Sequence, residues 1–119
     1  MNSSEFEKLV QETIREMGPL PEISELRNLY SELQEMVKTK SLREFKKCAE
    51  EKLNQYEDSE HFGTIETTKK MLRRCCLTKK DAEWILRIDM ETLDDLEVYK
   101  KRSIAIGEVT RKLIADLNK

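Results

Sequence analysis

Glycine and proline are scarce in this chain of 119 residues, which contains three glycines and two prolines. β-Hairpins depend on these residues at their turns, so the chain lacks most of the turn signals that a hairpin-built sheet requires. Charged residues make up 39% of the sequence, against about 25% in an average domain, so much of each element must face water. Both features favour long amphipathic helices.

The length of the chain limits its domain organisation. A sequence of this size can bury one hydrophobic core but not two, so we expect a single all-helical domain over residues 1–119. The net charge of −2 provides no global attraction to nucleic acid or to an anionic membrane. Any such contact therefore requires a local basic patch.

The sequence also argues against export and membrane insertion. Residues 1–7 include two acids and no apolar run, which is not the pattern of a signal or transit peptide. The longest apolar runs in the chain are three residues, whereas spanning a bilayer takes roughly 20. The odd number of cysteines, three, fits a reducing compartment. We therefore expect a cytoplasmic protein with no membrane partner.

A glycine and a proline separate the first two predicted helices. Ser4 and Glu7 have the spacing of a capping box, and Gly18 with the proline after it ends the first helix. The second helix follows Pro21. Its apolar residues step by three and four positions, which allows packing along another helix. They are Ile23, Leu26, Tyr30, Leu33 and Val37.

Two further capping signals predict the next helices. Ser41 and Glu44 form a second capping box, and the helix that they begin ends in a polar run near Gly63. Thr64 then has the position of a cap for a short fourth helix. The middle of the chain therefore predicts two more helices.

The start of the following helix carries two agreeing signals. Thr78 and Asp81 occupy the N-cap and N3 positions of a capping box. Leu77 and Ala82 have the spacing of a hydrophobic staple, which sets the angle at which the chain enters a helix. Further along, Asp89 is expected to restart or bend the helix.

The C-terminal region carries an apolar seam whose residues alternate by three and four positions. They are Leu96, Tyr99, Ser103, Ile106, Thr110, Leu113 and Leu117. One helix over residues 90–118 would be about 43 Å long, which exceeds the diameter of about 35 Å expected for a compact domain of this size. Either Gly107 breaks the helix, or the bundle is elongated or dimeric. The whole pattern predicts an all-α, single-domain antiparallel bundle of five or six helices with a long C-terminal helix.

Three cysteines and one histidine raise the question of a metal site. Structural zinc sites usually take ligands in pairs separated by roughly two to four residues. Cys75 and Cys76 are adjacent, so on a helix their side chains point about 100° apart. Cys48 and His61 stand alone in the sequence. The spacing therefore predicts no metal and no other cofactor, and free cysteines of this kind usually pack as small hydrophobes.

A redox switch is the alternative interpretation of the cysteine pair. Basic side chains on both sides of Cys75 and Cys76 would lower the pKa of a nearby thiol and favour the reactive thiolate. A thiol buried in apolar surroundings is inert whatever its neighbours in sequence. Measurement of the thiol pKa decides between the interpretations, because a value near or above that of free cysteine would exclude the redox switch.

Recognisable catalytic motifs are absent from the sequence. No serine, cysteine or threonine lies in a nucleophile motif, and no glycine-rich loop is available to hold a phosphate. His61 lies in the acidic stretch DSEHFG and is expected to cap a surface turn. Catalytic carboxylates can be scattered in sequence, but the pattern favours a protein that is not an enzyme and has no catalytic residues.

Positive charge is concentrated in residues 67–80, the basic segment, which has six basic residues and no acid. The flanking residues 1–66 and 81–119 carry net charges of −6 and −2. The candidate anion- or partner-binding residues are Lys69, Lys70, Arg73, Arg74, Lys79 and Lys80. A solvated charge run that pairs with acids on neighbouring helices explains the same residues without any partner.

Two lysines of the basic segment are unusual for their position. Lys79 and Lys80 are the first residues of a predicted helix, where the helix dipole disfavours positive charge. The basic residues before them fall at a predicted helix end, where the dipole favours cations. Together with the free N–H groups of the helix start, the six residues would form a corner suited to phosphate or to an acidic protein surface.

Two functions of different classes fit these features. The first is a non-catalytic protein–protein interaction or assembly module, in which a protein partner or a second copy covers the last helix. The candidate interface residues are Leu96, Tyr99, Ile106, Leu113 and Leu117. The alternative is a nucleic-acid-associated subunit that contacts phosphates through the basic segment, although no stacking aromatic lies among its basic residues.

Overall fold

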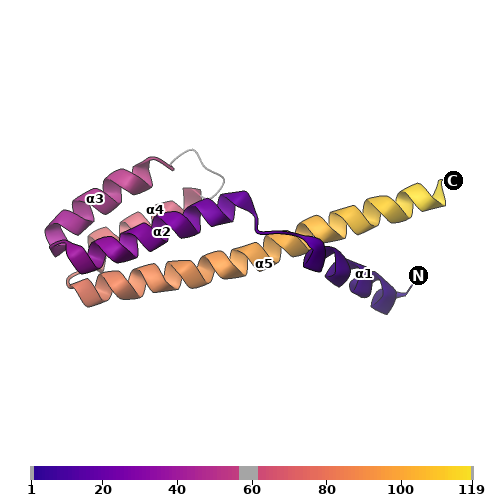
Figure 1. Cartoon of the computed structure of the whole chain (residues 1–119), viewed down its shortest axis with the longest axis horizontal. Helices are drawn as coiled ribbons and strands as arrows, with labels where there is room; N and C mark the ends of the chain where they lie inside the picture. Colours follow the sequence, from indigo (N-terminus) through magenta and orange to yellow (C-terminus); the bar gives the residue numbers. More distant parts are fainter. Residues whose placement is uncertain (1, 57–61, 119) are drawn as a thin grey trace. The chain divides into compact units, whose positions relative to one another are not determined.

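The structure, a computed structural model, describes residues 2–56 and 62–118. These residues form five α-helices and no strand (Figure 1). The helices are α1 (Ser3–Glu16), α2 (Pro21–Thr39), α3 (Leu42–Asn54), α4 (Phe62–Arg74) and α5 (Lys79–Leu117). The predicted all-α class and the long C-terminal helix are confirmed.

Helix α1 begins earlier than predicted. The side-chain oxygen of Asn2 accepts a hydrogen bond from the backbone N–H of Glu5 at 2.9 Å, so Asn2 is the N-cap. The capping box predicted for Ser4 and Glu7 is wrong, because asparagine caps as well as serine does and comes first in the chain. The helix ends before Gly18, as predicted.

Of the two caps predicted next, one is confirmed. Ser41 Oγ accepts a hydrogen bond from the backbone N–H of Glu44 at 3.2 Å and caps α3. Thr64 lies inside the first turn of α4 and is not its cap. Helix α4 begins two residues earlier, at Phe62.

The capping box at the start of α5 is confirmed. Thr78 Oγ1 accepts a hydrogen bond from the N–H of Asp81 at 3.1 Å. Asp81 Oδ2 in turn accepts from the N–H groups of Leu77 at 2.9 Å and Thr78 at 3.0 Å. The Leu77 side chain is 80% exposed, so the predicted staple contributes little. The two hydrogen bonds to Asp81 already hold the chain in place before the helix.

Helix α5 continues without interruption for 39 residues. Asp89 and Gly107 both lie inside it, so the predicted restart at Asp89 is wrong and the alternative of a break at Gly107 is excluded. A glycine costs a helix interior at most about 1 kcal/mol, which a long helix tolerates. The other expectation, an elongated or dimeric bundle, stays a prediction. Neither α5 nor any other helix of the described residues has the length and apolar composition of a membrane span.

Contacts between residues divide the chain into two compact units. The central unit is Glu25–Leu93, and the terminal unit combines Met1–Ser24 with Asp94–Lys119. Helix α5 contributes residues 79–93 to the central unit and residues 94–117 to the terminal unit. The single domain that the chain length suggests stays a prediction.

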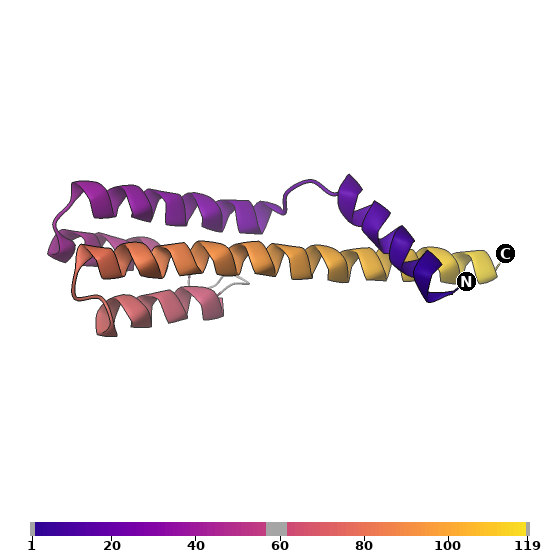
Figure 2. The same cartoon turned by 90° about the horizontal axis from the view of Figure 1, so that it is seen from below.

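Every helix of the central unit contributes to its core. The first part of α5 lies between α2 and α4 in Figure 2, and α3 packs against α4. The buried apolar residues of this unit are Leu26, Leu29, Tyr30, Leu33, Val37, Phe45, Ala49, Leu53, Ile65, Leu72, Cys76, Ala82, Ile85, Leu86 and Leu93. On its surface, Lys52 of α3 forms a salt bridge of 2.9 Å with Glu32 of α2.

The terminal unit has a much smaller core. Helix α1 crosses the C-terminal part of α5 at an angle (Figures 1 and 2), and Val10 is buried with Ala105 and Val109. The partly buried side chains around them are Phe6, Ile14, Met17, Ile106 and Leu113. Arg102 donates two hydrogen bonds to the carboxylate of Glu7, at 2.7 and 2.9 Å, and these lower the pKa of Glu7 to about 2.

The fold predicts a large loss of stability for one leucine substitution in the central unit and almost no change for another. Leu33→Ala removes a fully buried side chain and should lower the free energy of unfolding by about 2–5 kcal/mol. Leu77→Ala removes an exposed side chain and should change it by less than about 0.5 kcal/mol. Urea unfolding followed by far-UV circular dichroism measures both. A loss above 1 kcal/mol in Leu77→Ala would show, against expectation, that the staple contact is made.

Candidate functional site

The basic segment does not form one continuous charged surface. Lys69 is buried, and its ammonium lies 4.0 Å from a carboxylate oxygen of Glu66. Lys70 and Arg74 are exposed on α4. Arg73 is also exposed, and its guanidinium donates a hydrogen bond to Glu50 of α3, which raises the pKa of Arg73. Lys69 therefore differs from the exposed Lys70 and Arg74 by its burial, and Arg73 differs from them by its hydrogen bond to α3.

Two lysines of α3 join this pair. A groove of about 290 Å³ lies between α3 and α4, and we call it the basic groove. Its lining residues are Lys46, Lys47, Glu50, Lys69, Leu72 and Arg73. Four of these side chains are cationic and one is acidic, but Lys69 is buried and Arg73 is paired with Glu50, so the positive charge accessible to an anion comes mainly from Lys46 and Lys47.

Sequence reasoning missed Lys46 and Lys47. They lie more than twenty positions before Lys69, in a helix whose acids roughly balance its bases, so no local charge excess marks them. Only the packing of α3 against α4 brings these lysines to Lys69 and Arg73. Four of the six predicted residues, Lys70, Arg74, Lys79 and Lys80, do not line the groove.

Lys79 and Lys80 are exposed at the first two positions of α5, as predicted. The carboxylate of Asp81 stands beside them and accepts backbone hydrogen bonds from Leu77 and Thr78, which lower the pKa of Asp81. A negative charge at this point complements the helix dipole. The acid therefore offsets part of the unfavourable placement of the two lysines.

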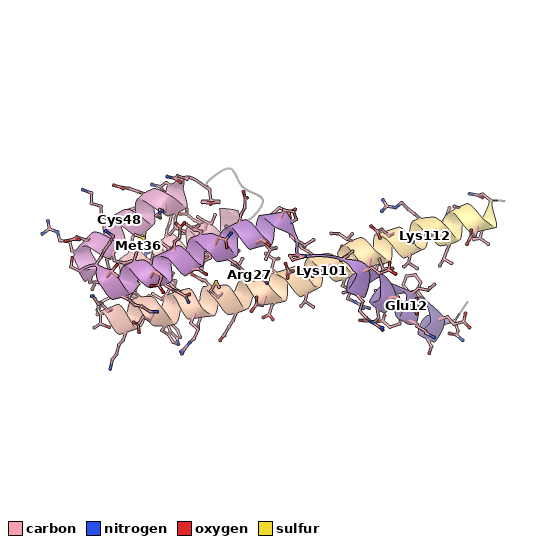
Figure 3. The ribbon with its side chains drawn as sticks, viewed as in Figure 1. Glu12, Arg27, Met36, Cys48, Lys101 and Lys112 are labelled. Atoms are coloured by element: carbon pink, nitrogen blue, oxygen red, sulfur yellow. The ribbon has the colours of Figure 1, made fainter. Side chains whose placement is uncertain are left out.

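The three cysteines have different surroundings. Cys76 is buried, its thiol donates a hydrogen bond to the carbonyl of Thr78 at 3.5 Å, and burial raises its pKa. Cys75 is exposed, and Cys48 is half-buried on α3 (Figure 3). The raised pKa disfavours the thiolate that a redox role of Cys76 would require.

The structure gathers no metal ligands within the part of the chain that it describes. In residues 2–56 and 62–118, no three histidine, cysteine or acidic side chains come close enough together to hold an ion. His61, for which we expect a cap on a surface turn, lies outside the described residues.

The predicted interface residues of α5 fall into two groups. Ile106 and Leu113 pack against the core that α5 shares with α1. Leu96 is half-buried, whereas Tyr99 and Leu117 are 71% and 84% exposed. Helix α1 crosses α5 at an angle (Figures 1 and 2), and the core between them takes in Ile106 and Leu113 but leaves Tyr99 and Leu117 exposed.

A buried polar network in the central unit was not predicted. Thr68 of α4 donates a hydrogen bond to Oδ2 of Asp89 on α5, at 2.7 Å. The Thr68 hydroxyl also lies 2.8 Å from the hydroxyl of Tyr30 on α2. With its single proton directed to Asp89, Thr68 accepts from Tyr30. One hydroxyl therefore connects three helices.

Burial dominates the titration of this network. Asp89 is 8% exposed, and loss of solvent raises its pKa to about 6 despite the hydrogen bond from Thr68. Burial raises the pKa of Tyr30 as well. A signal for Asp89 existed in the sequence, because Ala82, Leu86 and Leu93 place it on the buried side of a helix at a spacing of three and four.

No protein-family model, curated protein or solved structure was found to match this chain. Three features of the structure bear on its function. These are the basic groove, the partly exposed seam of α5 and the buried carboxylate of Asp89.

Asp89 predicts a specific pH dependence of stability. Its pKa is about 6 in the folded chain and near 3.8 when unfolded, so the folded chain holds more protons between these values. The protonated carboxyl of Asp89 therefore contributes its full stabilisation below about pH 4. This contribution is lost as the pH rises to about 6 and the buried group ionises. Urea unfolding from acid to neutral pH should show Asp89→Asn gaining stability relative to the native chain across this window.

A second variant tests the origin of this effect. Thr68→Val removes a hydrogen bond that lowers the pKa of Asp89, so the window should move to higher pH. A constant difference between Asp89→Asn and the native chain at all pH values would contradict the assignment.

Proposed function

We propose that this chain is a non-catalytic assembly module that pairs with a second copy of itself through α5. The surface concerned is the α5 stripe, defined as Leu96, Tyr99, Ser103, Ile106, Thr110, Leu113 and Leu117. One observation carries the proposal. The terminal unit has a core cluster of three buried side chains, yet leaves Tyr99 and Leu117 of the stripe more than half exposed.

The energetics of two paired helices support a partner for this surface. Most helical stability in proteins comes from burying an apolar face, and two helices with a small core bury little of it. Exposed apolar side chains that gather along one helix usually mark an interaction surface. Each square ångström of apolar area that a partner removes from water contributes roughly 25 cal/mol.

The spacing of the stripe supports a second copy as that partner. Steps of three and four residues are the spacing of a two-helix coiled-coil contact, and the matching helix must carry the same spacing. A second copy provides it automatically in a two-fold symmetric dimer. The small side chains of Ser103 and Thr110 near the middle of the stripe permit close approach of two backbones. A net charge of −2 causes little repulsion between copies.

We also propose that the protein is cytoplasmic; this location and the non-catalytic role both rest on the sequence. No recognisable catalytic motif is present, and the odd number of cysteines suits a reducing compartment. Turnover of a substrate that is lost on mutation of one carboxylate or of His61 would contradict the non-catalytic role.

Light scattering over a range of concentrations tests the dimer. The native chain should approach twice the monomer mass of 14.1 kDa as its concentration rises. Tyr99→Glu places a charge on the stripe and should weaken dimerisation by about tenfold or more, because a buried unpaired charge is costly.

Val98→Glu is the matched control for this substitution. Val98 is 69% exposed and Tyr99 is 71% exposed, but their side chains point about 100° apart on the helix. The control variant should therefore dimerise normally. A native chain that stays monomeric at every concentration, or an equal loss in both variants, would overturn the proposed interface.

A second candidate function is contact with nucleic-acid phosphates, and the basic groove favours it. The groove places Lys46, Lys47, Lys69 and Arg73 around a single acid. Arginine and lysine side chains at one concave surface suit phosphate oxygens, which accept several charge-assisted hydrogen bonds. We propose this contact for the groove together with the exposed remainder of the basic segment.

The salt dependence of RNA binding and two charge-matched variants test the proposed contact with phosphates. Neutralising about four phosphates should make the affinity for single-stranded RNA fall roughly 50-fold between about 50 and 200 mM salt. Lys46 and Lys47 changed together to Glu should weaken binding more than the same change at Lys79 and Lys80, which alters net charge equally. The reverse order would place the contact at the start of α5, and binding that ignores salt would exclude phosphate contacts.

A further inference from the structure

A second concave site lies in the central unit, between α4 and α5. It is a cavity of about 310 Å³, and we call it the amine cavity. Its lining residues are Gly63, Thr64, Thr67, Met71, Trp84, Ile85, Ile88, Asp89 and Thr92. The walls are mainly apolar or hydroxyl-bearing, and Asp89 is the one ionisable side chain among these lining residues.

The Asp89 carboxylate has an unused hydrogen-bonding oxygen. Oδ2 accepts the hydrogen bond from Thr68, at 2.7 Å. Among the described residues, no hydrogen bond or ion pair reaches Oδ1. A carboxylate that is 8% exposed and lacks a cationic partner is costly to keep ionised. A cation in the cavity would supply both the missing hydrogen bond and the missing charge.

Trp84 indicates the chemistry of the part of the ligand beyond its cationic group. Its indole is about half exposed and forms one wall of the cavity, with Ile88 one helical turn further along the same side of α5. An indole face attracts a cation and also packs against hydrocarbon or aromatic groups. The hydroxyls of Thr67 and Thr92 already donate to carbonyls within their own helices, so they present little donor capacity to a ligand.

The size of the cavity limits the ligand to a small molecule. Typical ligand sites range from about 300 to 1,000 Å³, so this one lies at the lower limit. It has room for one ring or a short branched hydrocarbon with an amino group, and the Asp89 carboxylate in its lining would repel the phosphates of a nucleotide.

We propose that the amine cavity binds a small protonated amine, with the ammonium group at Asp89 and the apolar body against Trp84. The ammonium donates to Oδ1 of Asp89 and leaves the Thr68 bond intact. This site is separate from the α5 stripe and from the basic groove, so the proposal does not depend on dimerisation or on phosphate binding.

Fluorescence of the full-length chain tests the proposal directly. Trp84 is the single tryptophan of the sequence, so its emission reports on the cavity wall. Titration with 2-phenylethylamine at neutral pH should give a saturable change, and 2-phenylethanol, which is neutral and of similar shape, should bind about tenfold more weakly or worse. Equal binding of the two compounds would overturn the role of Asp89.

Two substitutions and one control distinguish the effect of the Asp89 charge from the effect of the space in the cavity. Asp89→Asn keeps the shape of the side chain and should abolish the preference for the amine over the alcohol, whereas Asp95→Asn, at an exposed position of the same helix, should leave it unchanged. Thr67→Leu fills the cavity from an exposed position and should weaken both compounds. Circular dichroism confirms that each variant is folded.

A final comparison identifies the source of the amine. Nα-acetyl-lysine amide carries the ammonium of a protein side chain without an aromatic body. It should bind more weakly than 2-phenylethylamine, and tighter binding would assign the cavity to a partner's lysine and overturn the small-molecule proposal. Absence of a saturable change with every compound up to about 10 mM would overturn it altogether.

Discussion

The central unit depends on one hydroxyl group. Thr68 accepts from Tyr30 and donates to Asp89, and so connects α2, α4 and α5 inside the core. A buried polar group without a partner costs more than a typical hydrogen bond contributes, so this arrangement is stable only when all three side chains meet. The network thereby selects one relative placement of three helices that apolar packing alone would specify less strictly.

The two units differ in how completely their helices cover one another. In the central unit, four helical segments surround a shared core, and two of its concave surfaces differ in chemistry, one basic and one mainly apolar. In the terminal unit, α1 crosses α5 and buries few residues, so apolar side chains stay in contact with water. The first arrangement suits the binding of small or charged ligands, and the second suits association with another helix.

The distribution of charge shows how packing changes the meaning of a sequence pattern. The six cations of residues 67–80 form a continuous run in the chain, but in the structure Lys69 is buried and Arg73 is paired with Glu50. The most positive concave surface described is instead the basic groove, to which α3 contributes Lys46 and Lys47. In the terminal unit, Glu12 of α1 and Lys112 of α5, labelled in Figure 3, likewise line one groove although they are far apart in sequence.

The sequence by itself determined the helical class, the cap of α3 at Ser41 and the start of α5 at Thr78, because each cap joins atoms three or four positions apart. The same local rules failed at Ser4 and Thr64, where a neighbouring residue or an earlier start competed. Only the tertiary structure decided that Asp89 would meet Thr68, 21 positions away, and that Lys46 would face Lys69 across a groove. Such pairs depend on which helix faces pack together, and that choice is made by burial of the whole core, not by any nearby residue.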